Sequence, residues 1–242
     1  MATTPKPLTS TQLTILKITY KFRFVTADLI ASYRSTYKNA SYELLSKLHK
    51  NGYLGRRYNS SYKLIGQGAR YHLTSKSIKY LREQIELNEG VLHSRYKDST
   101  STEQFVLSAL EAFETAVRIR SLYPNIFTIF SEYELANYSH FPRPLPKLFI
   151  RRNESDITKP HEYFIELAGN NLFFIIKKQI NQCIEHYESG EWPHEGYPCI
   201  IFLTKNKNLK KNIEKYIEFL IDNGFIDEDE MKIIVTDAIS SL

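Results

Sequence analysis

The sequence predicts a two-domain α+β protein: an N-terminal helical domain ending in a β-hairpin, followed by an α/β domain built on a mixed sheet. Its 242 residues are enough for two small domains. Charge is distributed unevenly, because residues 1–82 hold 15 Lys and Arg against only Asp28 and Glu43, a net +13, while the remainder carries −8. The order of predicted elements also changes near residue 98. We therefore expect domains at residues 1–97 and 98–242.

Three helices are expected in the first domain, at residues 8–22, 25–33 and 37–52. Apolar residues recur at helical spacing in each, and Thr9 or Ser10 and then Thr26 can cap the first two. Gly52 supplies the positive φ that ends the third helix. The buried stripe of that third helix is expected at Leu44, Leu45 and Leu48. Three short helices with the last two closely linked predict a helix-turn-helix.

A β-hairpin is expected directly after the third helix. Residues 53–59 and 69–74 read as two tyrosine-rich strands joined by a polar, glycine-containing loop, and residues 75–87 as a closing helix. A helix-turn-helix followed by such a hairpin is the order of a winged helix. The stretches "LLSKLHKNGYLGRR" and "RYHLT" resemble the recognition-helix end and the wing strands of bacterial winged-helix regulators, over about the first third of the chain.

This order of elements predicts how double-stranded DNA would be contacted. The third helix would enter a major groove with an exposed N-terminal face, while its later lysines and the hairpin would meet phosphates or the minor groove. The expected base-reading residues are Lys38, Asn39, Ser41 and Tyr42, and the expected backbone contacts are Lys47, Lys50, Arg56, Arg57, Lys63 and Arg70. Alternatively, the basic face is merely solvated, or Arg56 and Arg57 protect an edge strand from aggregation. No acidic residue lies between 52 and 74 to neutralise them.

The second domain is expected to alternate helices and strands. A long amphipathic helix starts near Glu103, and a short helix is expected at residues 131–138. Further helices are expected at residues 171–190 and 208–224, with strands at 126–130, 147–152, 162–168, 198–204 and 231–237. Such an alternation favours a mixed sheet flanked by helices.

That order resembles the restriction-endonuclease-like core. Its pairing with an N-terminal winged helix resembles the replication-relaxation family of bacterial and plasmid proteins. The stretches that carry this resemblance are "FSEYEL", "YFIELA", "CIIFLTKN" and "IIVTDAISSL", and the match spans most of the chain. The resemblance implies a role in transcription regulation, or in the replication and transfer of plasmids or mobile elements.

Active nucleases of this fold carry an Asp at the start of one strand and Glu-x-Lys on the next, which together bind Mg²⁺. At the corresponding positions this sequence has Lys147, or a neighbouring apolar residue, and Ala168, and only Glu166 remains. A lone carboxylate is a poor Mg²⁺ site. Conceivable substitutes for the missing groups are Lys177, Lys178, Glu132 and Glu134. We expect no catalytic residue, no metal and no cofactor.

The expected protein is thus a cytoplasmic double-stranded DNA-binding protein that could act as a homodimer. Cys183 and Cys199 have neither metal-ligand spacing nor disulfide density, and no apolar run is long enough to cross a membrane. Two alternatives stay open. The protein could be a divergent metal-dependent nuclease, or its winged helix could be a module that binds another protein.

Overall fold

The computed structural model describes residues 8–84, 89–153, 161–169 and 171–239. Backbone contacts divide the chain into two compact units, Met1–Val117 and Arg118–Leu242, named here unit 1 and unit 2. Both contain helices, and unit 2 contains a mixed sheet, so the expected α+β class is confirmed. Among the helices that the structure describes, none combines the length and the apolar character needed to cross a bilayer.

Unit 1 begins with three helices, α1 (Ser10–Phe22), α2 (Ala27–Arg34) and α3 (Lys38–Lys50). Thr9 caps α1 in a capping box with Gln12, and Thr26 caps α2 by accepting the backbone N–H of Leu29. The chain leaves α3 through Gly52, whose φ of 76° is strained for a residue with a side chain.

An antiparallel hairpin follows α3, formed by β1 (Leu54–Arg57) and β2 (Arg70–Leu73). The link between the strands, expected as a polar loop, contains a short helix, α4 (Ser60–Leu64), that buries Tyr62. The other edge of β2 pairs with Val25 through two backbone hydrogen bonds between Val25 and Tyr71. All four residues of β2 are buried, and Tyr71 pairs on both edges of the strand.

Position 55 of β1 has no room for a side chain and therefore requires glycine. Its cross-strand partner is His72, which is buried and whose Nδ1 lies 3.0 Å from the Leu73 carbonyl oxygen. A Cβ at position 55 would lie 2.2 Å from Cε1 of that imidazole. Such a distance is far below van der Waals contact, so the ring takes the room that a side chain on β1 would need.

Unit 1 continues through α5 (Ser75–Gln84), α6 (Glu89–Ser94), the 3₁₀ helix η1 (Arg95–Thr100) and the first part of α7 (Glu103–Leu122). The last residues of the expected closing helix, 85–87, lie outside the described residues. Asp98 of η1 is fully buried and accepts a 2.7 Å hydrogen bond from Nε of Arg23, and Phe113 of α7 stacks on Phe22 at 4.5 Å between ring centroids. These contacts place residues 98–117 with unit 1, whereas the sequence had led us to expect a division after residue 97.

Unit 2 is built on a five-stranded sheet with the order β3-β4-β5-β6-β7. The strands are β3 (Phe127–Ser131), β4 (Leu148–Arg152), β5 (Glu162–Leu167), β6 (Cys199–Leu203) and β7 (Ile233–Thr236). The first three pair antiparallel and the last three pair parallel. The helices of this unit are α8 (Glu132–Leu135), α9 (Phe173–Glu188) and α10 (Lys207–Asp222).

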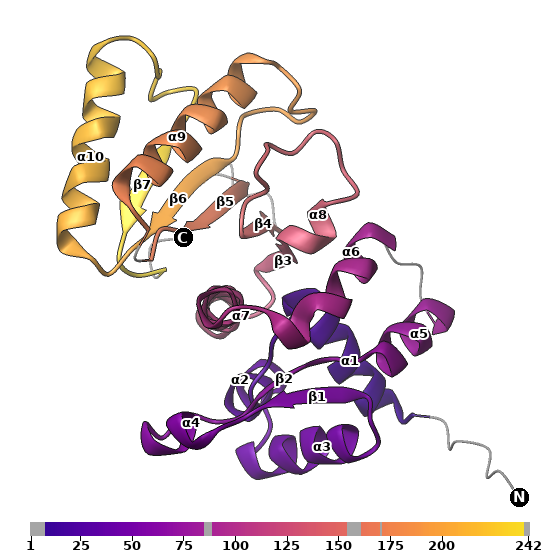
Figure 1. The fold of residues 1–242 in the computed structure, drawn as a ribbon. Helices are drawn as coiled ribbons and strands as arrows, with labels where there is room; N and C mark the ends of the chain where they lie inside the picture. The colour runs from indigo at the N-terminus through magenta and orange to yellow at the C-terminus, as the bar shows by residue number, and fades with distance from the viewer. Residues whose placement is uncertain (1–7, 85–88, 154–160, 170, 240–242) are drawn as a thin grey trace, which may run out of the picture. The chain divides into compact units, whose positions relative to one another are not determined.

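The core of unit 2 lies between one face of the sheet and the helices α9 and α10, which run next to each other in Figure 1. The sheet contributes Phe149, Phe164 and Phe202, and α9 contributes residues at helical spacing such as Ile176 and Ile180. Parallel neighbouring strands need a crossover connection, which α9 and α10 provide. Both helices are amphipathic because each buries its apolar side against the sheet.

Candidate nucleic-acid interface

Helix α3 has a buried side and an exposed polar side. Ser41, Leu45 and Leu48, spaced at i, i+4 and i+7, are fully buried. The residues predicted for DNA contact that lie exposed on this helix are Lys38, Asn39, Tyr42, Lys47 and Lys50. Figure 1 shows α3 next to the β1–β2 hairpin, and His49 links the two through a 2.9 Å contact between its Nδ1 and the Leu54 carbonyl oxygen.

Ser41 does not belong to the exposed side, and the expectation that it would do so is wrong. Its side chain has no solvent exposure, and its hydroxyl lies 3.2 Å from the hydroxyl of Thr36, just before the helix. A hydroxyl held there cannot reach a base edge. Leu44, expected in the buried stripe, is only half-buried, so Ser41 takes the place that the apolar pattern assigned to a leucine.

The hairpin exposes two of its four predicted cations, Arg56 on β1 and Lys63 on α4. The guanidinium of Arg56 lies 4.9 Å from the ring centroid of Tyr58, which is itself exposed. A cation held against an aromatic face keeps its charge and donors at the surface. Arg56 and Lys63 are therefore available to an external anion.

Arg70 and Arg57 are engaged inside unit 1, against expectation. Arg70 is buried, forms an ion pair with Glu103 and donates to the hydroxyl of Tyr62 at 3.1 Å. Arg57 donates to the Ser101 carbonyl oxygen at 2.6 Å and lies 3.6 Å from the same Glu103 carboxylate. The sequence showed no acid near these arginines because their acid comes from α7, more than 30 residues along the chain.

Glu103 thus joins both strands and the α4 link to the start of α7. Partial burial raises its pKa, but hydrogen bonds from Tyr62 and Arg70 outweigh this and hold the pKa of Glu103 below its usual range. The carboxylate therefore stays charged at neutral pH. Arg57, Arg70 and Tyr62 stabilise the hairpin and are unavailable to DNA phosphates.

Sequence reasoning missed several exposed residues in the same part of unit 1. Tyr37, at the N-cap of α3, is 87% exposed, and Leu64 and Ile65 at the end of α4 are 85% and 65% exposed. Tyr37 is the N-cap of α3 and lies outside its apolar stripe, so apolar periodicity did not mark it. Leu64 and Ile65 were missed because α4 was expected to be a loop.

In unit 2, the expected nuclease position is a row of three ionisable side chains. The antiparallel register pairs Ser131 with Leu148 and Leu148 with Ile165, so the next residues Glu132, Lys147 and Glu166 continue that row. Nζ of Lys147 lies 2.7 Å from Oε2 of Glu132. Burial raises the pKa of Glu166 to about 8, with Lys147 lowering it and Glu132 raising it.

This row holds little negative charge at neutral pH. Glu166 is mostly protonated there, and the charges of Glu132 and Lys147 cancel. Glu134, a conceivable replacement carboxylate, instead accepts hydrogen bonds from the backbone and hydroxyl of Ser131 in a capping box. Across the part of the chain that the structure describes, no three His, Cys, Asp or Glu side chains are placed to hold a metal.

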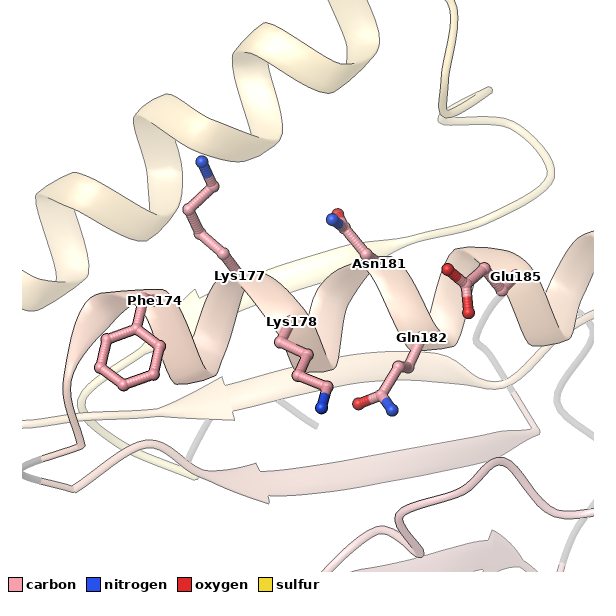
Figure 2. A pocket seen from close by; sticks show the side chains of 6 residues that line it. All are labelled: Phe174, Lys177, Lys178, Asn181, Gln182 and Glu185. Atoms are coloured by element: carbon pink, nitrogen blue, oxygen red, sulfur yellow. The ribbon is translucent and has the colours of Figure 1, made fainter.

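The lysines considered as substitutes lie on α9, and Lys177 points toward the neighbouring helix α10 (Figure 2). Nζ of Lys177 is 4.4 Å from the ring centroid of Tyr216 on α10, and the Tyr216 hydroxyl donates to Asn181 at 2.7 Å. Lys178 points away from α10 in the same view and is exposed. The open depression of about 430 Å³ beside them is lined by this one helix and has no converging walls.

Comparison with known proteins adds little to these observations. No family model matches the chain, and no curated protein matches it. A solved structure to which the chain is similar is that of TrmBL2, described as an archaeal chromatin protein with a novel mode of DNA binding. The identity is 12%, the match covers 93% of this chain and 74% of that one, and the TM-score is 0.21. A TM-score this low does not establish a shared fold, so any functional conclusion rests on the residues described above.

Proposed function

We propose that unit 1 is a winged helix-turn-helix that binds double-stranded DNA. In this proposal α2 and α3 form the helix-turn-helix, α3 enters the major groove, and the hairpin with α4 is the wing. The order of elements supports it, because three helices are followed by a two-stranded antiparallel hairpin and then by α5.

The observation that carries the proposal is the exposed charge on α3 and the hairpin. Five exposed cations lie there, Lys38, Lys47, Lys50, Arg56 and Lys63. Between residues 29 and 82 the sequence has a single acid, Glu43, and Asp28 forms an exposed ion pair with Lys38. A surface with that balance favours a polyanion.

The residues fall into three roles. Asn39 and Tyr42, near the N-terminal end of α3, are proposed to contact base edges. The five exposed cations are proposed to contact phosphates, which position the protein without reading sequence. Arg57 and Arg70 are proposed to act indirectly, by holding the wing against Glu103.

For unit 2 we propose a nuclease-like fold without catalysis. The support is the low charge of the Glu132, Lys147 and Glu166 row. Together with the resemblance to the replication-relaxation family, this favours a cytoplasmic regulator of transcription, or an accessory factor in plasmid or mobile-element replication and transfer. We propose a homodimer as the DNA-binding form, which sedimentation across a range of protein concentrations would test.

The experiment is fluorescence anisotropy of labelled duplex DNA at several salt concentrations. If all five cations neutralise phosphates, affinity should fall roughly 500-fold between about 50 and about 200 mM salt. The Arg56→Ala/Lys63→Ala variant should bind more weakly and show a slope of log K against log salt that is smaller by about 2.

The matched control is Lys205→Ala/Lys211→Ala, which removes two exposed lysines from unit 2 and changes net charge equally. It should retain the wild-type slope. Absent or salt-insensitive binding would refute the DNA proposal and favour a protein partner for the winged helix. Equal losses in both double variants would show that net charge, rather than the wing, determines affinity.

A further inference from the structure

Unit 2 contains a cavity of about 220 Å³ that the proposed DNA-binding function does not use. Its walls come from β3, α8, β4 and the segments that follow α8 and α9. Phe130, Phe141 and Phe149 provide aromatic walls, and His140, Arg151 and His194 add polar groups. Small-molecule sites typically combine apolar walls with a few placed polar groups in this way.

The aromatic walls suit a planar ring. Phe141 and Phe149 are buried, and their ring centroids are 5.1 Å apart with an angle of 75° between the ring planes. The ring centroid of Phe130 lies 5.8 Å from that of Phe149, with an angle of 31° between the planes. Rings at these angles offer both faces and edges, which favours stacked and edge-to-face contacts with a further aromatic ring. A dry cavity of about 150 Å³ can hold benzene, so this volume fits one substituted ring.

The polar groups of the cavity include hydrogen-bond donors. Nε of Arg151 donates to Glu162 at 2.7 Å, and its Nη2 lies 3.4 Å from Nε2 of His194. Arg151 lines the cavity, whereas Glu162 does not. Burial, and to a lesser extent His194, lower the pKa of His140, so at neutral pH this imidazole keeps one N–H donor.

This chemistry selects among ligands. Arg151 uses its Nε–H on Glu162 and one Nη2–H on Nε2 of His194, so its remaining guanidinium N–H groups are the donors left for a ligand that carries an acceptor. A carboxylate matches a guanidinium in both charge and geometry. The ring centroid of Trp192 lies 5.3 Å from that of Phe141 and 5.4 Å from that of His194. Its buried indole N–H has no hydrogen-bond partner among the residues that the structure describes.

We propose that this cavity binds a small planar aromatic acid. The ring lies among Phe130, Phe141 and Phe149, and the carboxylate accepts hydrogen bonds from Arg151 and His194. Every lining residue of this site belongs to unit 2, whereas the proposed DNA-binding residues belong to unit 1.

Trp192 makes the proposal directly measurable. It is the chain's single tryptophan, and its ring contacts His140, Phe141 and His194 around the cavity. Ligand entry should change its emission. The full-length protein is titrated with benzoate, following Trp192 fluorescence against a free-tryptophan control and heat by calorimetry. We expect saturable binding with a Kd of about 1 mM or tighter.

Two comparison compounds separate ring from charge. Cyclohexanecarboxylate keeps the charge without the aromatic ring, and benzamide keeps the ring without the charge, so both should bind at least about tenfold more weakly. Arg151→Gln should weaken benzoate binding by about tenfold or more. Arg118→Gln is the matched control, because Arg118 is exposed and does not line the cavity; it should bind as wild type.

Arg151→Gln removes the partner of buried Glu162, and this change could prevent folding. In that case His194→Ala is the test variant, because His194 is exposed. The proposal is overturned by the absence of saturable benzoate binding. Equal binding of benzamide or cyclohexanecarboxylate overturns it too, as does benzoate binding that is unchanged in the folded Arg151 or His194 variant.

Discussion

Replacing Asp98 with asparagine should destabilise unit 1 by about 3–5 kcal/mol. Asp98 has no solvent exposure, and Arg23 is only 8% exposed. Two hydrogen bonds join Nε and Nη2 of Arg23 to Oδ1 of Asp98. The asparagine would leave the guanidinium buried without its carboxylate, and removing one partner of a buried pair costs far more than the pair itself contributes.

The assay is urea unfolding followed by far-UV circular dichroism, with Trp192 emission as a separate report on unit 2. The Trp192 transition should not change. The matched control is Glu89→Gln, which breaks the Arg82–Glu89 pair, where both side chains are exposed at 46% and 65%. An exposed pair of this kind contributes about 1 kcal/mol or less.

A second arm tests the physical reason. The double replacement Arg23→Met/Asp98→Leu should recover most of the lost stability, because two apolar groups can replace a buried ion pair at little cost. An Asp98→Asn cost no larger than that of Glu89→Gln would refute the reasoning. It would mean that residues 98–117 contribute little to unit 1 and that the division expected after residue 97 describes the folding units better.

Three further outcomes are expected. The folded state raises the pKa of Glu166 from 4.5 to about 8, so the stability that its bound proton contributes is lost as pH rises from about 4.5 toward 8. In urea titrations, Glu166→Gln should therefore stabilise unit 2 by about 3 kcal/mol at pH 7 and not at all near pH 4. The exposed Glu185→Gln should show no such pH dependence. Gly55→Ala should cost about 1–3 kcal/mol in wild type and much less in a His72→Ala background, by thermal unfolding. Mg²⁺ or Mn²⁺ should not induce cleavage of duplex DNA on gels; cleavage that Glu166→Ala abolishes would instead establish the nuclease alternative.

Local signals predicted the strands and most of the helices, but not α4, α6 or η1. Thr9 and Thr26 cap the helices where their side chains suggested, and the apolar runs of unit 2 form the five expected strands. These features depend on neighbours within a few residues, which a single sequence displays directly. The short helix α4 escaped because its stabilising contact, from Tyr62 to Glu103, spans 41 residues.

The candidate site was predictable in location but only partly in membership. The basic stretch and the exposed face of α3 followed from charge and periodicity, and most of the predicted residues are exposed. Arg70 is buried because its guanidinium is engaged by Tyr62 and Glu103, and Ser41 is buried because α3 packs against α2. A charge count cannot distinguish an arginine that faces solvent from one whose partner lies on a distant helix.

The contact between Gly55 and His72 predicts that these two positions covary among homologues. Since the imidazole occupies the space of a Cβ on the facing strand, the two positions cannot change independently. Homologues that carry alanine or serine at position 55 should carry a smaller residue at position 72, and those that keep histidine should keep glycine. Paired substitution at these two positions would identify distant relatives that share this hairpin even after the surrounding sequence has diverged.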